Sequence, residues 1–487
     1  MNITVIGGGT VGSLITFYLQ TSFPDIKITN IHSPAKDIIG VGEGMTGALR
    51  YFLFAYNARG RTQVISDQEF FKETKATIKL TIKYEDWGPI DYWSGFEENA
   101  IDPWDLSVYD AAKIHHNKAT WFNRNSHWCQ KNQTGFETVD DFDSPYGYHF
   151  DGNLISKFFL SKCNATKFIY DDVVDVTYHD DGHINELITK TGLKVETDFV
   201  IDCSGFYRVF QQKHDLKLTK IKSTLMNRAM PFLVPIKEDE EIDVFTTAKA
   251  MQYGWMWKIP VGNRYGMGYV YNKDLISDDD VLAEAETKLN RKIDPIKFID
   301  WEPAISEKIW HKNVLMLGLS ANFIEPLEAT SIHGTISSFL NFLTHTTKII
   351  DGKITIPKEC FKNEILQNNY NGVINRLNRS YESFIQQHYL NPKYKTEFWN
   401  WYADKSNWTD MNRFLVEKGN AAHLVDLDFG ETINGKPGPG LQYPTLLDLN
   451  LVKPPERGWA FSDGLPDFAD RYNHDTYTMR SLQQYMY

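Results

Sequence analysis

The chain opens with the apolar pattern of a buried strand, followed by a glycine-rich turn and a helical pattern. Residues 2–6 are mostly apolar and lead directly into Gly7-Gly8-Gly9-Thr10-Val11-Gly12. Apolar residues then recur at helical spacing from Ser13 to Gln20, and a second strand-like run covers residues 26–31. This order of strand, glycine turn, helix and strand predicts a βαβ unit that binds a dinucleotide.

Three glycines of this turn each have a physical role. Gly7 makes the tight turn, Gly9 lets the backbone approach a pyrophosphate, and Gly12 lets helix and strand pack closely. Thr10 and Val11 begin the helix, whose N-terminus faces the phosphate charge. These residues alone fit NAD and FAD equally well, and a glycine turn without a ligand is the remaining alternative.

The acidic residue that usually holds the cofactor ribose is missing from its expected place. About 20 residues after the last glycine of such a turn an Asp or Glu is typical, but this chain has His32 there. A neutral imidazole accepts one hydrogen bond and does not grip two hydroxyls. We therefore expect a looser grip on the cofactor, or Glu43 as the substitute.

A strictly alternating segment follows between Ala76 and Tyr84. Ile78, Leu80, Ile82 and Tyr84 share one face, and Thr77, Lys79, Thr81 and Lys83 share the other. This period of two predicts a half-buried strand. On alternation alone Lys79 and Lys83 are equivalent solvated lysines.

The rest of the chain extends the same architecture. The runs 197–201 and 314–317 predict further strands, and spacing from Ile332 to about Ile350 predicts a helix. Residues 361–408 are mostly helical in pattern, and 430–444 form a turn-rich loop. We expect a mixed α/β fold with a discontinuous dinucleotide-binding domain in residues 1–350, inserted segments near 76–150 and 211–300, and a mainly helical region from 351 to 487.

Composition removes several classes of function. The 487 residues carry 51 Lys+Arg against 63 Asp+Glu, a net charge of −12, which argues against a nucleic-acid binder. Four cysteines without a Cys-x-x-Cys pair argue against a disulfide scaffold, a zinc ribbon or an iron–sulfur cluster. The start of the chain has no secretory leader and no run is long enough for a membrane helix, which indicates a cytoplasmic protein. The aromatic content of 14% hints at flat ligands.

Several strings occur together and in order, and they resemble the flavin-dependent tryptophan halogenase family. The leading string is Trp255-Met256-Trp257-Lys258-Ile259-Pro260, which matches the Trp-x-Trp-x-Ile-Pro signature of that family after an N-terminal glycine turn. The other matching strings are Gly40-Val41-Gly42-Glu43, Tyr148-His149-Phe150-Asp151, Asp202-Cys203-Ser204-Gly205-Phe206, Phe323-Ile324-Glu325-Pro326-Leu327-Glu328-Ala329-Thr330 and Phe384-Ile385-Gln386-Gln387-His388-Tyr389. The resemblance covers roughly residues 1–400.

The resemblance implies an FAD-dependent monooxygenase-like fold and an enzyme with two reaction sites. FAD, reduced by a separate flavin reductase, and dioxygen convert halide into hypohalous acid, which then travels to a lysine beside an aromatic substrate. By match that lysine is Lys79. An ammonium donates a hydrogen bond to hypohalous acid and raises its electrophilicity, and a free amine forms a haloamine.

The second implied catalytic residue is Glu328. Its carboxylate would stabilise the cationic ring intermediate and remove the ring proton. An ordinary acidic residue near a helix start is the competing interpretation. Glu325, three residues earlier, is expected to be a capping or structural carboxylate.

The residues after Glu328 depart from the family pattern. The family usually continues Ser-Thr-Gly there, and backbone amides of the last two residues bind halide; this chain has Ala329-Thr330-Ser331. Thr330 and Ser331 are therefore the expected halide residues. Serine in place of glycine limits positive φ and adds a hydroxyl, so bromide and iodide stand beside chloride as expected halides.

The resemblance also assigns residues to the flavin and to the substrate. Gly42, Glu43, Trp255, Trp257 and Ile324 are expected at the flavin, in addition to the glycine turn and His32. Tyr92, Trp93 and Phe96 are expected to sandwich an indole or phenol, with core packing as the equal alternative. No metal is expected, and a homodimer is left open.

Two other functions remain open from the sequence. One is an FAD-dependent aromatic hydroxylase, although that class carries a Gly-Asp motif where this chain has Gly318-Leu319-Ser320. The other is a noncatalytic flavin-binding protein, which His32, Ala329 and Ser331 would permit. The presence of both Lys79 and Glu328 favours the halogenase.

Overall fold

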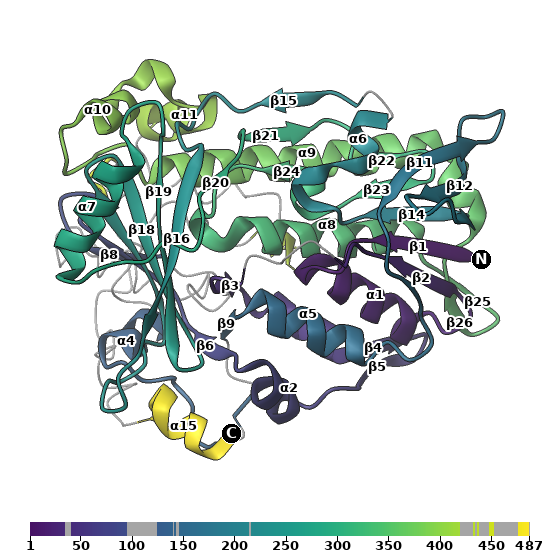
Figure 1. Ribbon diagram of the computed structural model, residues 1–487, viewed down its shortest axis with the longest axis horizontal. Helices are drawn as coiled ribbons and strands as arrows, with labels where there is room; N and C mark the ends of the chain where they lie inside the picture. The colour runs from purple at the N-terminus through teal and green to yellow at the C-terminus, as the bar shows by residue number, and fades with distance from the viewer. Residues whose placement is uncertain are drawn as a thin grey trace, which may run out of the picture.

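The computed structural model describes residues 1–34, 40–94, 124–139, 141–142, 146–213, 216–418, 432–433, 436–437, 448–451 and 476–486. Two large sheets organise this part of the chain, and the long helices α8 (Thr330–Thr346) and α9 (Glu364–Gln387) extend across its middle (Figure 1). The fold combines parallel and antiparallel sheets with helices, as the sequence predicts.

The predicted dinucleotide-binding sheet has six strands in the order β10-β2-β1-β14-β23-β22. All neighbours are parallel except β22, which pairs antiparallel with β23. In that order the strands are Lys167–Ile169, Lys27–Ile31, Asn2–Ile6, Phe199–Asp202, Val314–Met316 and Trp310–His311. The four strands expected from the apolar runs are thus confirmed. Because its strands come from three distant parts of the chain, we propose the discontinuous domain within residues 1–350 on this topology.

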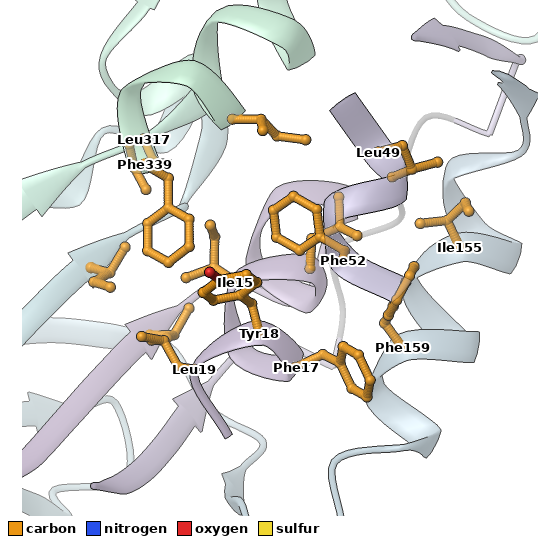
Figure 2. Packing of buried hydrophobic residues seen from close by; sticks show 14 of the residues in the cluster. Ile15, Phe17, Tyr18, Leu19, Leu49, Phe52, Ile155, Phe159, Leu317 and Phe339 are labelled. Atoms are coloured by element: carbon orange, nitrogen blue, oxygen red, sulfur yellow. The ribbon is translucent and has the colours of Figure 1, made fainter. Parts of the chain in front are cut away.

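Helix α1 (Thr10–Ser22) follows the glycine turn and anchors the core beside this sheet. Tyr18 of α1 lies 5.5 Å, ring to ring, from both Phe52 of η1 (Gly47–Leu53) and Phe339 of α8. Phe17 lies 5.2 Å from Phe159 of α5 (Gly152–Ser161). Figure 2 shows these side chains converging from elements far apart in the sequence. Their burial fixes α1, and with it the glycine turn, at the carboxyl end of the inner strand β1.

The second large sheet has seven strands in the order β20-β16-β19-β18-β17-β7-β8. In that order they are Ile299–Asp300, Arg228–Pro235, Arg264–Tyr271, Gly254–Val261, Thr246–Met251, Ile82–Glu85 and Tyr92–Ser94. A small antiparallel sheet, β3-β9-β6 (Glu43–Met45, Gly147–Phe150 and Thr77–Lys79), lies between the two large sheets in Figure 1. It carries Lys79 at its end.

The expected half-buried strand from Ala76 to Tyr84 is wrong in two respects. The segment divides into β6 and β7, which belong to different sheets. Its polar face is also buried through Thr81, because the hydroxyls have partners: Thr77 Oγ1 donates to Pro260 O at 2.8 Å and Thr81 Oγ1 donates to Ser94 O at 2.6 Å.

The remaining elements are short or peripheral. The strands are β4 (Phe54–Asn57), β5 (Gly60–Gln63), β11 (Val173–Tyr178), β12 (Ile184–Thr189), β13 (Lys194–Glu196), β15 (Leu218–Lys220), β21 (Ala304–Ser306), β24 (Asn322–Phe323), β25 (Lys348–Ile350), β26 (Lys353–Thr355), β27 (Thr432–Ile433) and β28 (Lys436–Pro437). The helices are α2 (Asp67–Thr74), α4 (Arg124–Gln130), α6 (Val209–Lys213), α7 (Asp278–Leu289), α10 (Glu397–Ala403), α11 (Asp410–Lys418), α15 (Met479–Met486) and the 3₁₀ turns η4 (Gly205–Tyr207), η5 (Gly318–Ser320), η6 (Leu327–Ala329), η7 (Lys358–Lys362) and η8 (Lys405–Asn407).

Candidate active site

Lys79 is a buried lysine at the end of β6, with a side chain that is 1% exposed. Its Nζ lies against Gly44 of β3, where an added Cβ would stand only 3.1 Å away. Fully buried lysines are rare unless paired or functional, because burial removes the hydration of the ammonium. The glycine at position 44 leaves the space that this amine occupies.

A buried histidine lies next to Lys79 in the same small sheet. His149 of β9 contacts Thr77 Oγ1 through Nδ1 at 3.3 Å and Thr246 Oγ1 through Nε2 at 2.9 Å. Burial, and then the nearby Lys79, hold the pKa of His149 well below its ordinary value. His149 is therefore neutral and adds no second positive charge beside the lysine.

Glu328 lies in the turn that leads into α8, and its carboxylate is buried. Tyr84 of β7 donates a hydrogen bond from its hydroxyl to Glu328 Oε1 at 2.6 Å, and His388 Nε2 lies 3.0 Å from the same oxygen. Glu328 and Ala329 both have left-handed backbone conformations, with φ of +64° and +54°. Each such conformation costs a non-glycine residue about 1–2 kcal/mol, so these side-chain contacts hold the turn against a local preference.

The charge state of Glu328 follows from these partners. Burial raises the pKa of Glu328, but the contact with His388 and the hydrogen bonds from Ser94 and Tyr84 outweigh burial and bring it below its ordinary value. Glu328 is a carboxylate at neutral pH. A buried, negatively charged group of this kind can stabilise a cation or accept a proton.

Glu325, three residues earlier, is buried with different partners. Tyr389 donates to its Oε1 at 2.5 Å and Thr224 Oγ1 donates to its Oε2 at 2.9 Å. Burial raises the pKa of Glu325 to about 7. Adjacent residues at the end of α9, His388 and Tyr389, therefore contact the two carboxyl groups of one turn, but burial dominates only at Glu325.

A pocket at the start of α8 brings together several of the expected residues. It is lined by Ile305, Asn322, Phe323, Ile324, Glu325, Thr330, Ser331, Asn378 and Tyr381. Thr330 and Ser331 are the first two residues of α8, so their backbone N–H groups belong to a helix start, a favourable place for an anion. Ser331 itself is helical, so the expected backbone limitation does not arise there; the positive φ angles lie at Glu328 and Ala329.

The glycine turn before α1 has the shape that a dinucleotide phosphate needs. A Cβ on Gly7 would stand 2.3 Å from Cys203 O and one on Gly12 would stand 2.1 Å from Gly7 O, so both glycines are required by packing. A Cβ on Gly9 would meet nothing within 4 Å, and α1 has no side-chain cap. Free space and unsatisfied N–H groups at a helix start fit the pyrophosphate of FAD.

The two candidate ribose-side residues are both near this turn. The ring of His32 packs on Gly8, and its Nδ1 lies 2.7 Å from Asn30 Oδ1. Burial lowers the pKa of His32, which keeps it neutral. Glu43 Oε1 accepts a hydrogen bond from Thr10 Oγ1 at 3.1 Å, and burial raises its pKa to about 7. Glu43 is thus a carboxyl group held directly at the first residue of α1.

Comparison with known proteins identifies the family. The family model described as tryptophan halogenase matches residues 2–426, most of the chain. The chain belongs to the tryptophan halogenase family. Tryptophan 7-halogenase KtzQ of Kutzneria sp. (strain 744) is 28% identical over 448 residues, 82% of this chain and 78% of that protein. Tryptophan 7-halogenase RebH of Lentzea aerocolonigenes is 26% identical over 433 residues, with the same shares covered.

Solved structures agree on the fold of this halogenase. A tryptophan halogenase from Shewanella frigidimarina NCIMB 400 has a TM-score of 0.85 at 20% identity, covering 99% of this chain and 97% of that one. Tar14, a tryptophan C-6 flavin-dependent halogenase from taromycin biosynthesis, has a TM-score of 0.82 at 20% identity, with 100% and 99% covered.

Family membership settles the class of reaction. The chain is a flavin-dependent halogenase, an oxidoreductase that uses FAD with halide and dioxygen as co-substrates. The hydroxylase and the noncatalytic protein left open by the sequence are thereby disfavoured. Within the described ranges, no helix is long and apolar enough to cross a membrane, and no group of three or more His, Cys, Asp or Glu is placed to hold a metal.

The tryptophan pair of the halogenase signature lies on β18, inside the seven-stranded sheet. Trp255 is 2% and Trp257 is 7% exposed, and their rings meet edge to face at 6.2 Å. The ring of Trp257 covers Gly268 of β19, where a Cβ would stand 2.2 Å away. Among the described residues the indole N–H of Trp257 has no hydrogen-bond partner. A cofactor or water acceptor would satisfy that donor.

Of the three expected substrate residues, the structure describes Tyr92 and Trp93, and both are buried. Tyr92 is fully buried and its hydroxyl contacts His388 Nδ1 at 2.9 Å. Trp93 is 3% exposed and packs edge to face on Phe245. Phe96 lies outside the described residues. Substrate contact by these three residues stays a prediction.

Three residues that contact Glu328 have no role that the sequence pattern predicts: Tyr84, Ser94 and His388. Tyr84 belonged to the apolar face of a predicted strand, which gave no sign that its hydroxyl bonds Glu328. His388 lies within a string that matches the family. That match was the one signal for it, and the contact with Glu328 required the tertiary structure.

Proposed function

We propose that this halogenase acts on an electron-rich aromatic substrate of indole type, with Lys79 and Glu328 as its catalytic pair. One observation carries the proposal: both residues are buried, and Lys79 and the turn that contains Glu328 both approach the short strand β3. Lys79 Nζ packs on Gly44 of β3, and η6, which contains Glu328, also contacts β3. A buried cation donor and a buried carboxylate around one strand suit electrophilic aromatic substitution.

Lys79 activates the halogenating species. In its ammonium form it donates a hydrogen bond to the oxygen of hypohalous acid, which makes the halogen more electrophilic. In its amine form it exchanges a proton for the halogen, giving a haloamine and water. In this buried place no water competes for the contact between Lys79 and the hypohalous acid, which strengthens that contact in either form.

Glu328 acts on the ring. As the carbon–halogen bond forms the ring becomes cationic, and the carboxylate stabilises that charge. The carbon–hydrogen bond then breaks, its electron pair returns to the ring, and the proton passes to Glu328. The oxygen of hypohalous acid leaves as water after taking up a proton.

FAD, when bound and reduced, supplies with dioxygen the oxidising power that turns halide into hypohalous acid. We assign the pyrophosphate to the turn at Gly9 and Thr10, and the ribose side to Glu43 and His32. The flavin region is assigned to Gly42, Trp255, Trp257 and Ile324, beside the glycines and Val11 of the turn. Reduction by a separate flavin reductase is part of the proposal.

We assign halide binding to the N–H groups of Thr330 and Ser331 in the pocket at the start of α8. Bromide and iodide are proposed beside chloride because they are easier to oxidise. KtzQ and RebH are named as tryptophan halogenases, which supports an indole ring in the substrate.

The test uses purified protein with FAD, a flavin reductase and NADH. Chloride, bromide and iodide are offered in turn with a panel of indoles, phenols and free tryptophan, and products are identified by mass spectrometry. We expect a halide-dependent mass increase on an indole. Hydroxylated product without halide dependence, or no product with any halide, would overturn the proposal.

A further inference from the structure

Residues 40–43 form a short segment that lies between helix α5 and strand β19. A Cβ on Gly40 would stand 2.1 Å from Asn153 Nδ2 of α5, and a Cβ on Gly266 of β19 would stand 1.5 Å from Val41 O. Neither contact leaves room for a side chain, so glycine is required at both positions. The segment therefore contacts both the helix that packs on α1 and the seven-stranded sheet.

Arg264, the first residue of β19, joins this segment to α5. Its Nη2 donates to Gly40 O at 3.0 Å and to Asp151 Oδ2 at 2.5 Å. The other carboxylate oxygen of Asp151, Oδ1, accepts from the backbone N–H groups of Asn153 and Leu154 and so caps α5. The side chains of Arg264 and Asp151 are 21% and 14% exposed. One guanidinium nitrogen thus holds the segment and the start of α5 together.

The other end of the segment is Glu43, which reaches the start of α1. Glu43 pairs across β3 and β9 with Phe150, the residue before Asp151. Its Oε1 accepts the hydrogen bond from Thr10 Oγ1 at 3.1 Å. Burial is the main cause of the raised pKa of Glu43, and the charge of Asp151 raises it further against the hydrogen bond from Thr10. The two carboxyl groups are therefore close enough to interact, and Arg264 offsets the charge of Asp151.

A dinucleotide would bring more negative charge to this place. The glycine turn, residues 7–12, offers backbone N–H groups to a pyrophosphate but contains no Lys or Arg. Carboxylates near an anionic ligand weaken its binding unless their charge is offset. A guanidinium suits this task because it stays charged and can donate to several oxygens at once. Arg264 thus supplies charge compensation and a backbone contact from one side chain.

We propose that Arg264 is a positioning residue for the flavin cofactor, because it holds residues 40–43 where Glu43 meets the start of α1. This rests on the proposed function, in which Gly42 and Glu43 belong to the FAD site. Arg264 lies in the seven-stranded sheet, whereas the glycine turn follows β1 of the other large sheet. It acts through Gly40 and Asp151, so the second sheet contributes to cofactor affinity.

Cofactor affinity is the direct readout and requires no turnover. Arg264→Gln removes the charge, and we expect the Kd for oxidised FAD, measured by flavin fluorescence, to rise about tenfold, roughly the effect of one lost charge-assisted hydrogen bond. Arg264→Lys keeps a positive charge and a donor and should restore most of the affinity. At saturating reduced FAD, Arg264→Gln should keep a kcat close to that of the wild type, so that the change appears in KM.

Arg228→Gln is the matched control. Arg228 of β16 lies at the opposite end of the paired strands β16 and β19. Its side chain is 19% exposed and pairs with Asp278 at 2.8 Å and Asp300 at 2.7 Å. This change removes the same charge from the same sheet and should leave the Kd for FAD unchanged. Equal losses of affinity in the two variants would overturn the proposal, as would wild-type affinity in a folded Arg264→Gln protein.

A double variant tests the ion pair itself. Asp151→Asn removes the carboxylate charge and keeps a side chain that caps α5 well. In that background Arg264→Gln leaves no unpaired carboxylate, so the two changes together should weaken FAD binding less than the sum of their separate effects. The double variant should still bind FAD more weakly than Asp151→Asn, because the contact with Gly40 O is lost. Additive effects, or affinity equal to that of Asp151→Asn, would contradict the proposal.

The role of Arg264 and the proposed function fail on different results. A wild-type enzyme that binds FAD but gives no halogenated product would overturn the proposed function, while a weaker affinity in Arg264→Gln would still support the role of Arg264. A wild-type enzyme that halogenates, together with an Arg264→Gln enzyme of unchanged KM for reduced FAD, would overturn the role of Arg264 alone.

Discussion

Two lysines four residues apart, Lys79 and Lys83, occupy very different environments. Lys79 is buried beside Gly44, whereas Lys83 is a quarter exposed and pairs with Glu85 at 2.8 Å. Their alternation is identical, but the chain passes from one sheet to another between them, at Leu80 and Thr81. Alternation thus predicts that the two lysines share a face, whereas the change of sheet determines that Lys79 is buried and Lys83 is not.

The two glutamates of the turn before α8 repeat this contrast. Glu328 faces an imidazole and a phenol and is held as a carboxylate, whereas Glu325 faces a phenol and a hydroxyl and has its pKa raised to about 7. Both are buried. Burial raises the pKa of each carboxyl group, and only at Glu328 do the partners outweigh it.

The largest expected effect is a difference in halogenated product between alanine variants of the two lysines. Lys79→Ala should abolish halogenated product while FAD affinity is retained, because the lysine is far along the chain and in a different sheet from the glycine turn. Lys83→Ala should remain active, since it removes an exposed pair worth little. Product is measured by mass spectrometry and FAD affinity by fluorescence.

The glutamate comparison predicts the next effect. Glu328→Gln should lower kcat by about 10²–10⁴-fold, the range for a lost general base. Glu325→Gln keeps hydrogen bonding to Tyr389 and Thr224 and should lose far less. Equal losses in steady-state kcat for the two variants would contradict the assignment of Glu328 as the base.

Glu325 also predicts a pH dependence of stability. Its pKa of about 7 lies above the ordinary 4.5, so the unfolded chain loses this proton first as pH rises and the fold is destabilised between about pH 4.5 and 7. The loss amounts to about 3 kcal/mol. Glu43 has a pKa raised by the same amount, so urea unfolding at pH 5 and pH 8 should show a stability difference that is about 3 kcal/mol smaller in Glu325→Gln than in the wild type; an equal difference in the two proteins would refute the prediction.

A smaller effect is expected from the glycine under Lys79. In Gly44→Ala the new methyl group would stand 3.1 Å from Nζ and displace the amine by a few tenths of an ångström. Misplacement of a catalytic group on this scale should lower kcat about tenfold. Gly372→Ala on α9, where the nearest atom is 3.7 Å away, is the control and should leave kcat unchanged.

The sequence was sufficient where local pattern determines structure. The strands Asn2–Ile6 and Lys27–Ile31 and the helix between them follow from apolar spacing and three glycines. The division of residues 76–84 between two sheets did not follow, because it depends on partners such as Pro260 and Ser94 that are distant along the chain. Family resemblance singled out Lys79 and Glu328, while the role of His388 required the fold that brings α9 to the turn.

The most direct measurement of the central claim is the ratio of halogenated aromatic product to flavin oxidised, taken with a soluble scavenger of hypohalous acid present. In wild type and Lys83→Ala we predict that aromatic product dominates. In Lys79→Ala we predict that flavin oxidation continues, that the scavenger is halogenated instead, and that aromatic product disappears. Aromatic product from Lys79→Ala at the wild-type ratio would contradict the account.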